Sequence, residues 1–136
     1  MKDVTIQQFE KSFSRHYATY KTITPANHSA YVLLFYAVEC GLKSLIMKEE
    51  RVFLFSKLSE DAKQCKHDVK KMLKILGIEA SYHLETIKTN RDEVITSGHY
   101  NEYFRYGMEC KSEELVKERI VIDELQKIAD WIKTII

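Results

Sequence analysis

The sequence predicts an all-α fold, arranged as an antiparallel bundle of four to five helices. Only one Pro and four Gly occur among the 136 residues, which disfavours a turn-rich sheet protein. Apolar residues recur every three to four positions in several long segments, as on one face of a helix. The stretch 31–47 is apolar on nearly every face, which is typical of a helix at the centre of a domain. The length fits one domain, residues 1–136.

The first two helices are the clearest elements. Aromatic residues follow helical spacing in the first of them: Phe9, Phe13, Tyr17 and Tyr20. Pro25 and Asn27 end this helix, and either Asn27 or Ser29 can cap the next. The central helix then continues to about residue 50, followed by the short apolar connector 52–55.

The second half of the chain is expected to be helical as well. A third helix begins near residue 60 and ends at Gly77, which suits a C-cap by residue type. Residues 79–90 have a weak helical pattern, and 96–98 form a break. Ser112 can cap the last helix. The apolar seam of that helix has the heptad spacing of bundle packing: Val121, Leu125, Ile128, Ile132 and Ile135.

Composition restricts the function classes. A net charge of +1 gives the whole chain no signature of polyanion binding, so such a surface must come from local clustering. Cys40, Cys65 and Cys110 form no CxxC pair, which favours a reducing compartment over a disulfide framework. The first ten residues lack the apolar core of a signal peptide, and no apolar run is long enough for a bilayer. We therefore expect a cytoplasmic protein without a membrane segment.

Two charged residues interrupt the apolar central helix. Glu39 and Lys43 lie four residues apart, in the favourable order of acid before base, so they can meet on one face. A buried ion without a partner is very costly. We expect either a structural ion pair or a polar notch where the core meets a ligand.

The third helix has a basic face with two interpretations. Its lysines fall on the arc opposite the apolar residues: Lys63, Lys66, Lys70, Lys71 and Lys74. This face is either solvated surface or a weak RNA- or phosphate-binding site. His67 lies among the lysines and is either an acid–base group or a surface histidine.

An aromatic block around Arg105 offers another candidate. Tyr100, Tyr103, Phe104 and Tyr106 flank this single guanidinium. Aromatic rings beside Arg suit base stacking and phosphate binding. The same residues suit a core in which Arg105 pairs with a buried carboxylate such as Glu39. Metal-ligand spacing, P-loops and dinucleotide or nucleophile motifs do not occur in the sequence, so we expect no metal and no cofactor.

Three short segments resemble HEPN domains. "YAVECGLKSLI" (36–46) is similar to their second helix, "KHDVKKMLKILG" (66–77) to the following helix, and "EYFRYG" (102–107) to the Arg-Tyr element before the last helix. The resemblance spans roughly residues 25–135. It implies a helical, commonly dimeric domain of prokaryotic toxin–antitoxin, CRISPR-associated or phage-defence systems. It carries over Glu39, Lys43, His67, Arg105 and Tyr106 as candidate ligand-binding residues.

The chain departs from the catalytic motif of this family. Many HEPN domains are metal-independent RNases with an Arg-x4-6-His motif. Here Arg91 and His99 are separated by seven residues, and residues 96–98 interrupt the helix that would align them. The candidates for a rearranged catalytic site are His99, Arg105, Arg91 and His67.

Three functions follow as hypotheses. The first is a HEPN-like module that binds RNA or a nucleotide, or serves as a partner subunit, in a toxin–antitoxin or antiviral system. In this case Lys63, Lys66, Lys70 and Lys74 contact phosphate. The second is a metal-independent endoribonuclease with a rearranged Arg/His site. The third is a structural dimerisation or adaptor bundle. A homodimer is expected in each case, with an antitoxin or defence-complex protein as possible partner.

Overall fold

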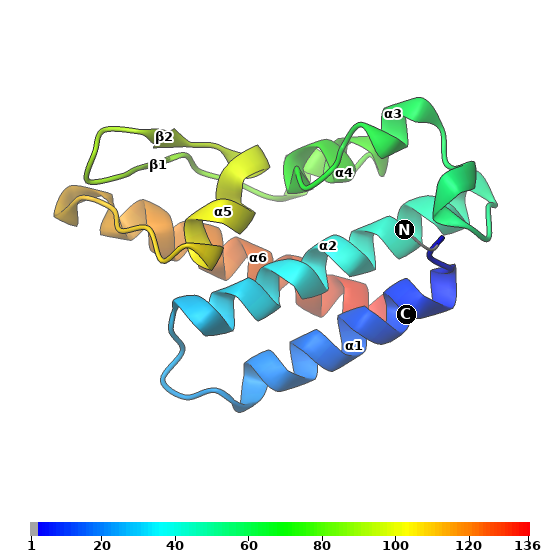
Figure 1. Ribbon diagram of the computed structural model, residues 1–136, viewed down its shortest axis with the longest axis horizontal. Helices are drawn as coiled ribbons and strands as arrows, with labels where there is room; N and C mark the ends of the chain where they lie inside the picture. The colour runs from blue at the N-terminus through cyan, green and yellow to red at the C-terminus, as the bar shows by residue number, and fades with distance from the viewer. Residues whose placement is uncertain (1–2) are drawn as a thin grey trace.

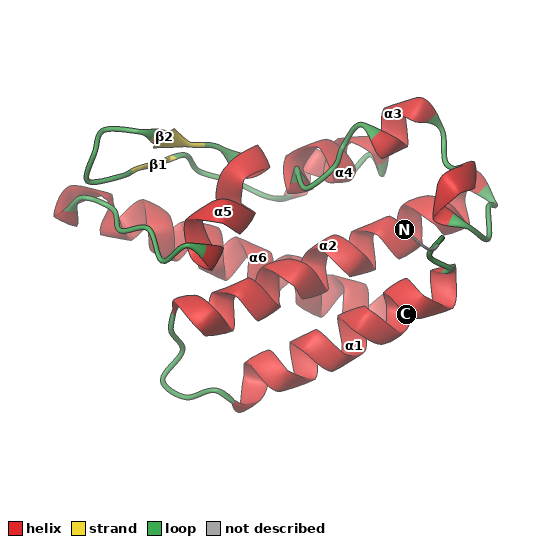
Figure 2. Cartoon of the chain, in the orientation of Figure 1, coloured by secondary structure: helices red, strands yellow, loops and turns green. Residues whose placement is uncertain are grey.

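A computed structural model of the chain describes residues 3–136, which contain three long helices and a set of shorter elements (Figure 1). The long helices are α1 (Ile6–Thr22), α2 (His28–Glu50) and α6 (Leu115–Ile135). The short ones are α3 (Glu60–Lys63), α4 (Val69–Ile75) and α5 (Tyr100–Arg105). A two-stranded sheet, β1 (Ile87–Lys88) and β2 (Val94–Ile95), is the only one in this part of the chain. The described residues are thus mostly helical, as expected, with a small sheet added (Figure 2).

Local capping explains where the first two helices begin. Thr5 and Gln8 form a capping box, in which each side chain bonds the backbone of the other residue. The Asn27 side chain accepts a hydrogen bond from the Ala30 amide at 2.9 Å, which confirms Asn27 as the cap of α2. The short connection makes α1 and α2 antiparallel neighbours (Figure 1).

Helix α2 is the centre of the core. It packs against α1, α6, α5 and α4. In its most apolar stretch of 18 residues, 72% is buried. By length and composition alone α2 could span a membrane. Its burial accounts for the apolar residues as core packing, which is consistent with a soluble protein.

The three long helices meet at Gly41. A Cβ atom there would lie 2.8 Å from Ile132 Cγ2 on α6 and 3.0 Å from Phe13 Cδ1 on α1. Both neighbours are almost fully buried. Glycine at this position therefore lets α1 and α6 approach α2 more closely than any other residue would.

The continuous helix predicted for residues 60–77 is wrong. The chain leaves α3 after Lys63 and re-enters a helix only at Val69, with Lys66 at a φ of 50°. Asp68 starts the new helix by accepting from the Lys71 amide at 3.3 Å. The predicted end at Gly77 is confirmed, because Gly77 has a φ of 74° and the Ile78 amide bonds the Leu73 carbonyl at 3.0 Å.

The helical pattern proposed for residues 79–90 is also wrong. Only the single turn Glu79–Ser81 is helical there, and the chain then becomes extended and forms β1. Ile87 pairs with Ile95 of β2, and both are buried beneath the hairpin. Two residues per strand carry too little alternation to be recognised in the sequence.

The C-terminal part agrees with the sequence prediction except at its edges. Ser112 begins a separate turn, Ser112–Glu114, and does not cap α6. The first four seam residues of α6 are buried, whereas Ile135 is 47% exposed. The Tyr103 hydroxyl donates to Glu118 Oε2 at 2.5 Å, which fixes α5 to α6.

The close contact at Gly41 gives a stability prediction. Gly41→Ala should lower the free energy of unfolding by about 1–3 kcal/mol, because the methyl group overpacks a junction of three helices. In an exposed helix the same change would be stabilising by about 1 kcal/mol. Urea unfolding followed by circular dichroism measures the difference, and a gain in stability would contradict the packing described.

Candidate functional site

The predicted pair of Glu39 and Lys43 is confirmed and is joined by His67. Lys43 Nζ lies 2.6 Å and His67 Nδ1 2.9 Å from the same oxygen, Glu39 Oε2. The Glu39 side chain is 7% exposed and that of Lys43 16%, whereas His67 is half exposed. Because its Nδ1 is held by Glu39, His67 has Nε2 left for another partner.

His67 and His99 line one cavity of about 360 Å³. His67 comes from the break between α3 and α4, and His99 from the turn Ser97–His99 that precedes α5. The basic residues Lys66 and Lys71 line the same cavity. Two imidazoles and two ammonium groups from segments about thirty residues apart therefore converge, and we call this space the histidine cavity.

The carboxylates beside the histidine cavity already have partners. Asp68 Oδ1 accepts from the Ser97 hydroxyl at 2.6 Å, which ties the two walls together. Glu102 Oε2 lies 3.5 Å from His99 Nδ1. Asn101 is another lining residue, only 7% exposed, and its Oδ1 has no hydrogen-bond partner among the described residues. The positive charge of the cavity thus comes from Lys66 and Lys71.

The predicted lysine face is divided by the break before α4. Lys66 and Lys71 reach the histidine cavity, and Lys71 with Lys74 lines a second hollow beside Cys65. Lys70 lies 3.9 Å from Glu79 on another side, and Lys63 lies 3.8 Å from Glu60. The single arc of five lysines assumed one continuous helix and is therefore wrong.

The alternative in which Arg105 pairs with the buried Glu39 carboxylate in the core is wrong. Arg105 is exposed and forms no ion pair with Glu39; its guanidinium lies 5.6 Å from the centre of the Tyr106 ring. Tyr106 is 65% exposed, whereas Tyr103 and Phe104 belong to the core, as expected for those two. Tyr100 is also buried.

Arg91 and His99 do not share a site. Arg91 lies in the turn between β1 and β2 and lines a different cavity, together with Met108 and Glu109. His99 lies beyond β2, at the histidine cavity. The hairpin places the two residues at opposite ends of β2, which explains why no helix aligns them.

Metal and thiol chemistry find no support in residues 3–136. No group of three or more His, Cys, Asp or Glu residues there is arranged to hold a metal ion. All three cysteines are free, and burial raises the pKa of each thiol. A raised pKa lowers the thiolate fraction at neutral pH, so none of them is an activated nucleophile.

The histidine cavity includes residues that the sequence did not reveal. Asn101, Glu102 and Asp68 have no distinguishing spacing, and only the fold brings them to His67. The arrangement is able to bind a phosphate through its cationic groups. It is also able to exchange protons through two imidazoles, each paired with a carboxylate.

Comparisons with known protein families, with curated proteins and with solved structures gave no match.

The buried pair gives a second stability prediction. Glu39→Gln should lower the free energy of unfolding by about 3–5 kcal/mol, since the Lys43 ammonium loses its counter-charge in a nearly enclosed position. Glu49→Gln, an exposed carboxylate on the same helix, is the matched control, with a change within about 0.5 kcal/mol. Chemical unfolding measures both. The loss in Glu39→Gln/Lys43→Met should be smaller than the sum of the single losses; additive losses would show that the two side chains do not interact.

Proposed function

We propose that the protein binds a phosphate-bearing ligand, RNA or a nucleotide, in the histidine cavity, as a HEPN-like helical module of a toxin–antitoxin or antiviral system. The observation that carries this proposal is the convergence of His67, His99, Lys66 and Lys71 on one hollow. Charge-assisted hydrogen bonds from such groups are the usual means of holding phosphate oxygens. The HEPN-like bundle, a homodimer and a cytoplasmic location belong to the same proposal.

The HEPN-like assignment is supported by the role of the shared segments. The Glu-x3-Lys element lies in the central helix, and the His of "KHDVKKMLKILG" contacts its glutamate at 2.9 Å. Two of three motifs that resemble the family thus form one polar cluster. Dimerisation is supported by apolar side chains exposed on α6, namely Leu115 and Val116, at 56% and 70%.

Phosphate binding should depend on the cavity lysines. Lys66→Gln and Lys71→Gln should each weaken binding of a short single-stranded RNA and lower the magnitude of its salt slope by about 1. Lys133→Gln, an exposed lysine on α6, should change neither. Fluorescence anisotropy at several salt concentrations measures these effects, with a mononucleotide as the second ligand. Equal loss in all three variants would refute the assignment to this cavity.

A second candidate function is metal-independent RNA cleavage. It is favoured by the carboxylate partner of each imidazole, Glu39 for His67 and Glu102 for His99. One neutral imidazole would take the proton of the ribose 2′-hydroxyl while the 2′-oxygen forms a bond to phosphorus. The other, protonated, would give a proton to the departing 5′-oxygen as the P–O5′ bond breaks, leaving a 2′,3′-cyclic phosphate.

Cleavage is tested with a DNA oligonucleotide that contains a single ribonucleotide. His67→Ala and His99→Ala should each lower the cleavage rate by about 10²–10⁴-fold, and an all-deoxy oligonucleotide should stay intact. His16→Ala, a histidine on α1, is the control. If the unmodified protein leaves the oligonucleotide intact, the cleavage hypothesis is wrong. Phosphate binding is tested separately by the anisotropy measurements.

A further inference from the structure

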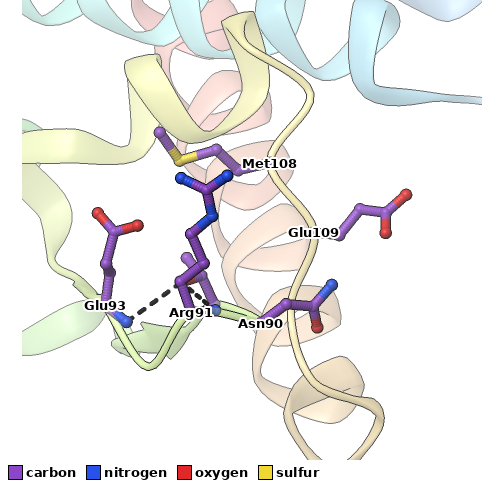
Figure 3. A pocket seen from close by; sticks show the side chains of 6 residues that line it. Asn90, Arg91, Glu93, Met108 and Glu109 are labelled. Carbon is purple, nitrogen blue, oxygen red and sulfur yellow. Dashed lines mark hydrogen bonds between the residues drawn. The ribbon is translucent and has the colours of Figure 1, made fainter.

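Another cavity, of about 320 Å³, lies at the turn of the β1–β2 hairpin. It is lined by Thr89, Asn90, Arg91, Glu93, Met108 and Glu109. Figure 3 shows the Arg91 side chain extending from the turn toward Met108, with Glu93 on one side and Glu109 on the other. We call it the hairpin cavity. It shares no lining residue with the histidine cavity.

Hydrogen bonds fix the backbone that forms the hairpin cavity. The buried Thr89 hydroxyl oxygen accepts from the Arg91 amide at 3.3 Å and from the Glu93 amide at 3.2 Å (Figure 3). The Asn90 amide donates to the Glu109 carbonyl at 3.1 Å, which joins the turn to the segment before α6. The backbone that carries the charged side chains is therefore braced before any ligand arrives.

The charges around this cavity are of both signs. The remaining acid of the turn, Asp92, is paired with Lys111, and this ion pair lowers the pKa of Asp92. In the part of the chain that the structure describes, Arg91, Glu93 and Glu109 form no ion pair. A free phosphate would meet one guanidinium and two carboxylates, so a simple anion is disfavoured by like-charge repulsion. A ligand with charges of both signs is favoured.

We propose that the hairpin cavity binds a small zwitterion of the α-amino-acid type. Its carboxylate would bond the Arg91 guanidinium, whose fork of N–H groups matches two carboxylate oxygens. Its ammonium group would bond Glu93 or Glu109. The Met108 thioether provides the apolar contact for an aliphatic side chain. The proposal is independent of the function assigned to the histidine cavity.

Chemical-shift titration with L-leucine, acetate and methylamine tests the proposal. L-leucine should bind in the millimolar range or tighter and perturb the amides of residues 89–93 and 108–109, whereas acetate and methylamine should bind at least about tenfold more weakly. Arg91→Gln and Glu93→Gln should each weaken L-leucine by about tenfold or more, and Arg15→Gln, an exposed arginine on α1, should not.

Two results would overturn the proposal. The first is acetate binding as tightly as L-leucine, which would indicate a site for simple anions. The second is unchanged leucine affinity in Arg91→Gln. Arg91 and Glu93 are exposed, so these variants should keep the far-ultraviolet spectrum and melting temperature of the unmodified protein.

Discussion

The structure depends on the burial of α2 by the elements packed around it. A helix without a polar face is stable in water only when other elements cover all of it. Helices α1 and α6 approach it closely at Gly41, and α4 and α5 cover other parts of its surface. The same burial encloses Glu39, whose charge would be very costly without compensation. Lys43 and His67 provide it through a shared carboxylate oxygen.

The contacts of Lys43 and His67 with the buried Glu39 carboxylate account for the position of the histidine cavity. His67 reaches Glu39 from the irregular segment between α3 and α4. A continuous helix over this segment would point the His67 side chain in another direction. Asp68, the next residue, starts α4 and also accepts a hydrogen bond from Ser97. One short break therefore joins the core helix, α4 and the turn that carries His99. The cavity walls are held by groups that also stabilise the fold, so variants of Asp68 should affect both.

The two cavities differ in charge, and this difference separates the ligands proposed for them. The histidine cavity has lysines and imidazoles, and its carboxylates are already bonded to Ser97 or His99. The hairpin cavity has one guanidinium between carboxylates that have no ion pair among residues 3–136. The first arrangement favours phosphate, and the second favours a ligand that carries both charges. In both proposals the ligand is selected by local groups, because the net charge of the chain is only +1.

The sequence by itself determined the long helices, the cap at Asn27, the stop at Gly77 and the ion pair within α2. These features depend on local spacing and local hydrogen bonds, which a linear pattern records. Tertiary contacts decided the break at Lys66, the hairpin of Ile87 and Ile95, and the exposure of Arg105. They also decided which distant residues share a cavity, because only the packing around α2 brings His67, His99 and Asn101 together. Pairing across long sequence separations depends on packing, and no periodicity in the chain specifies it.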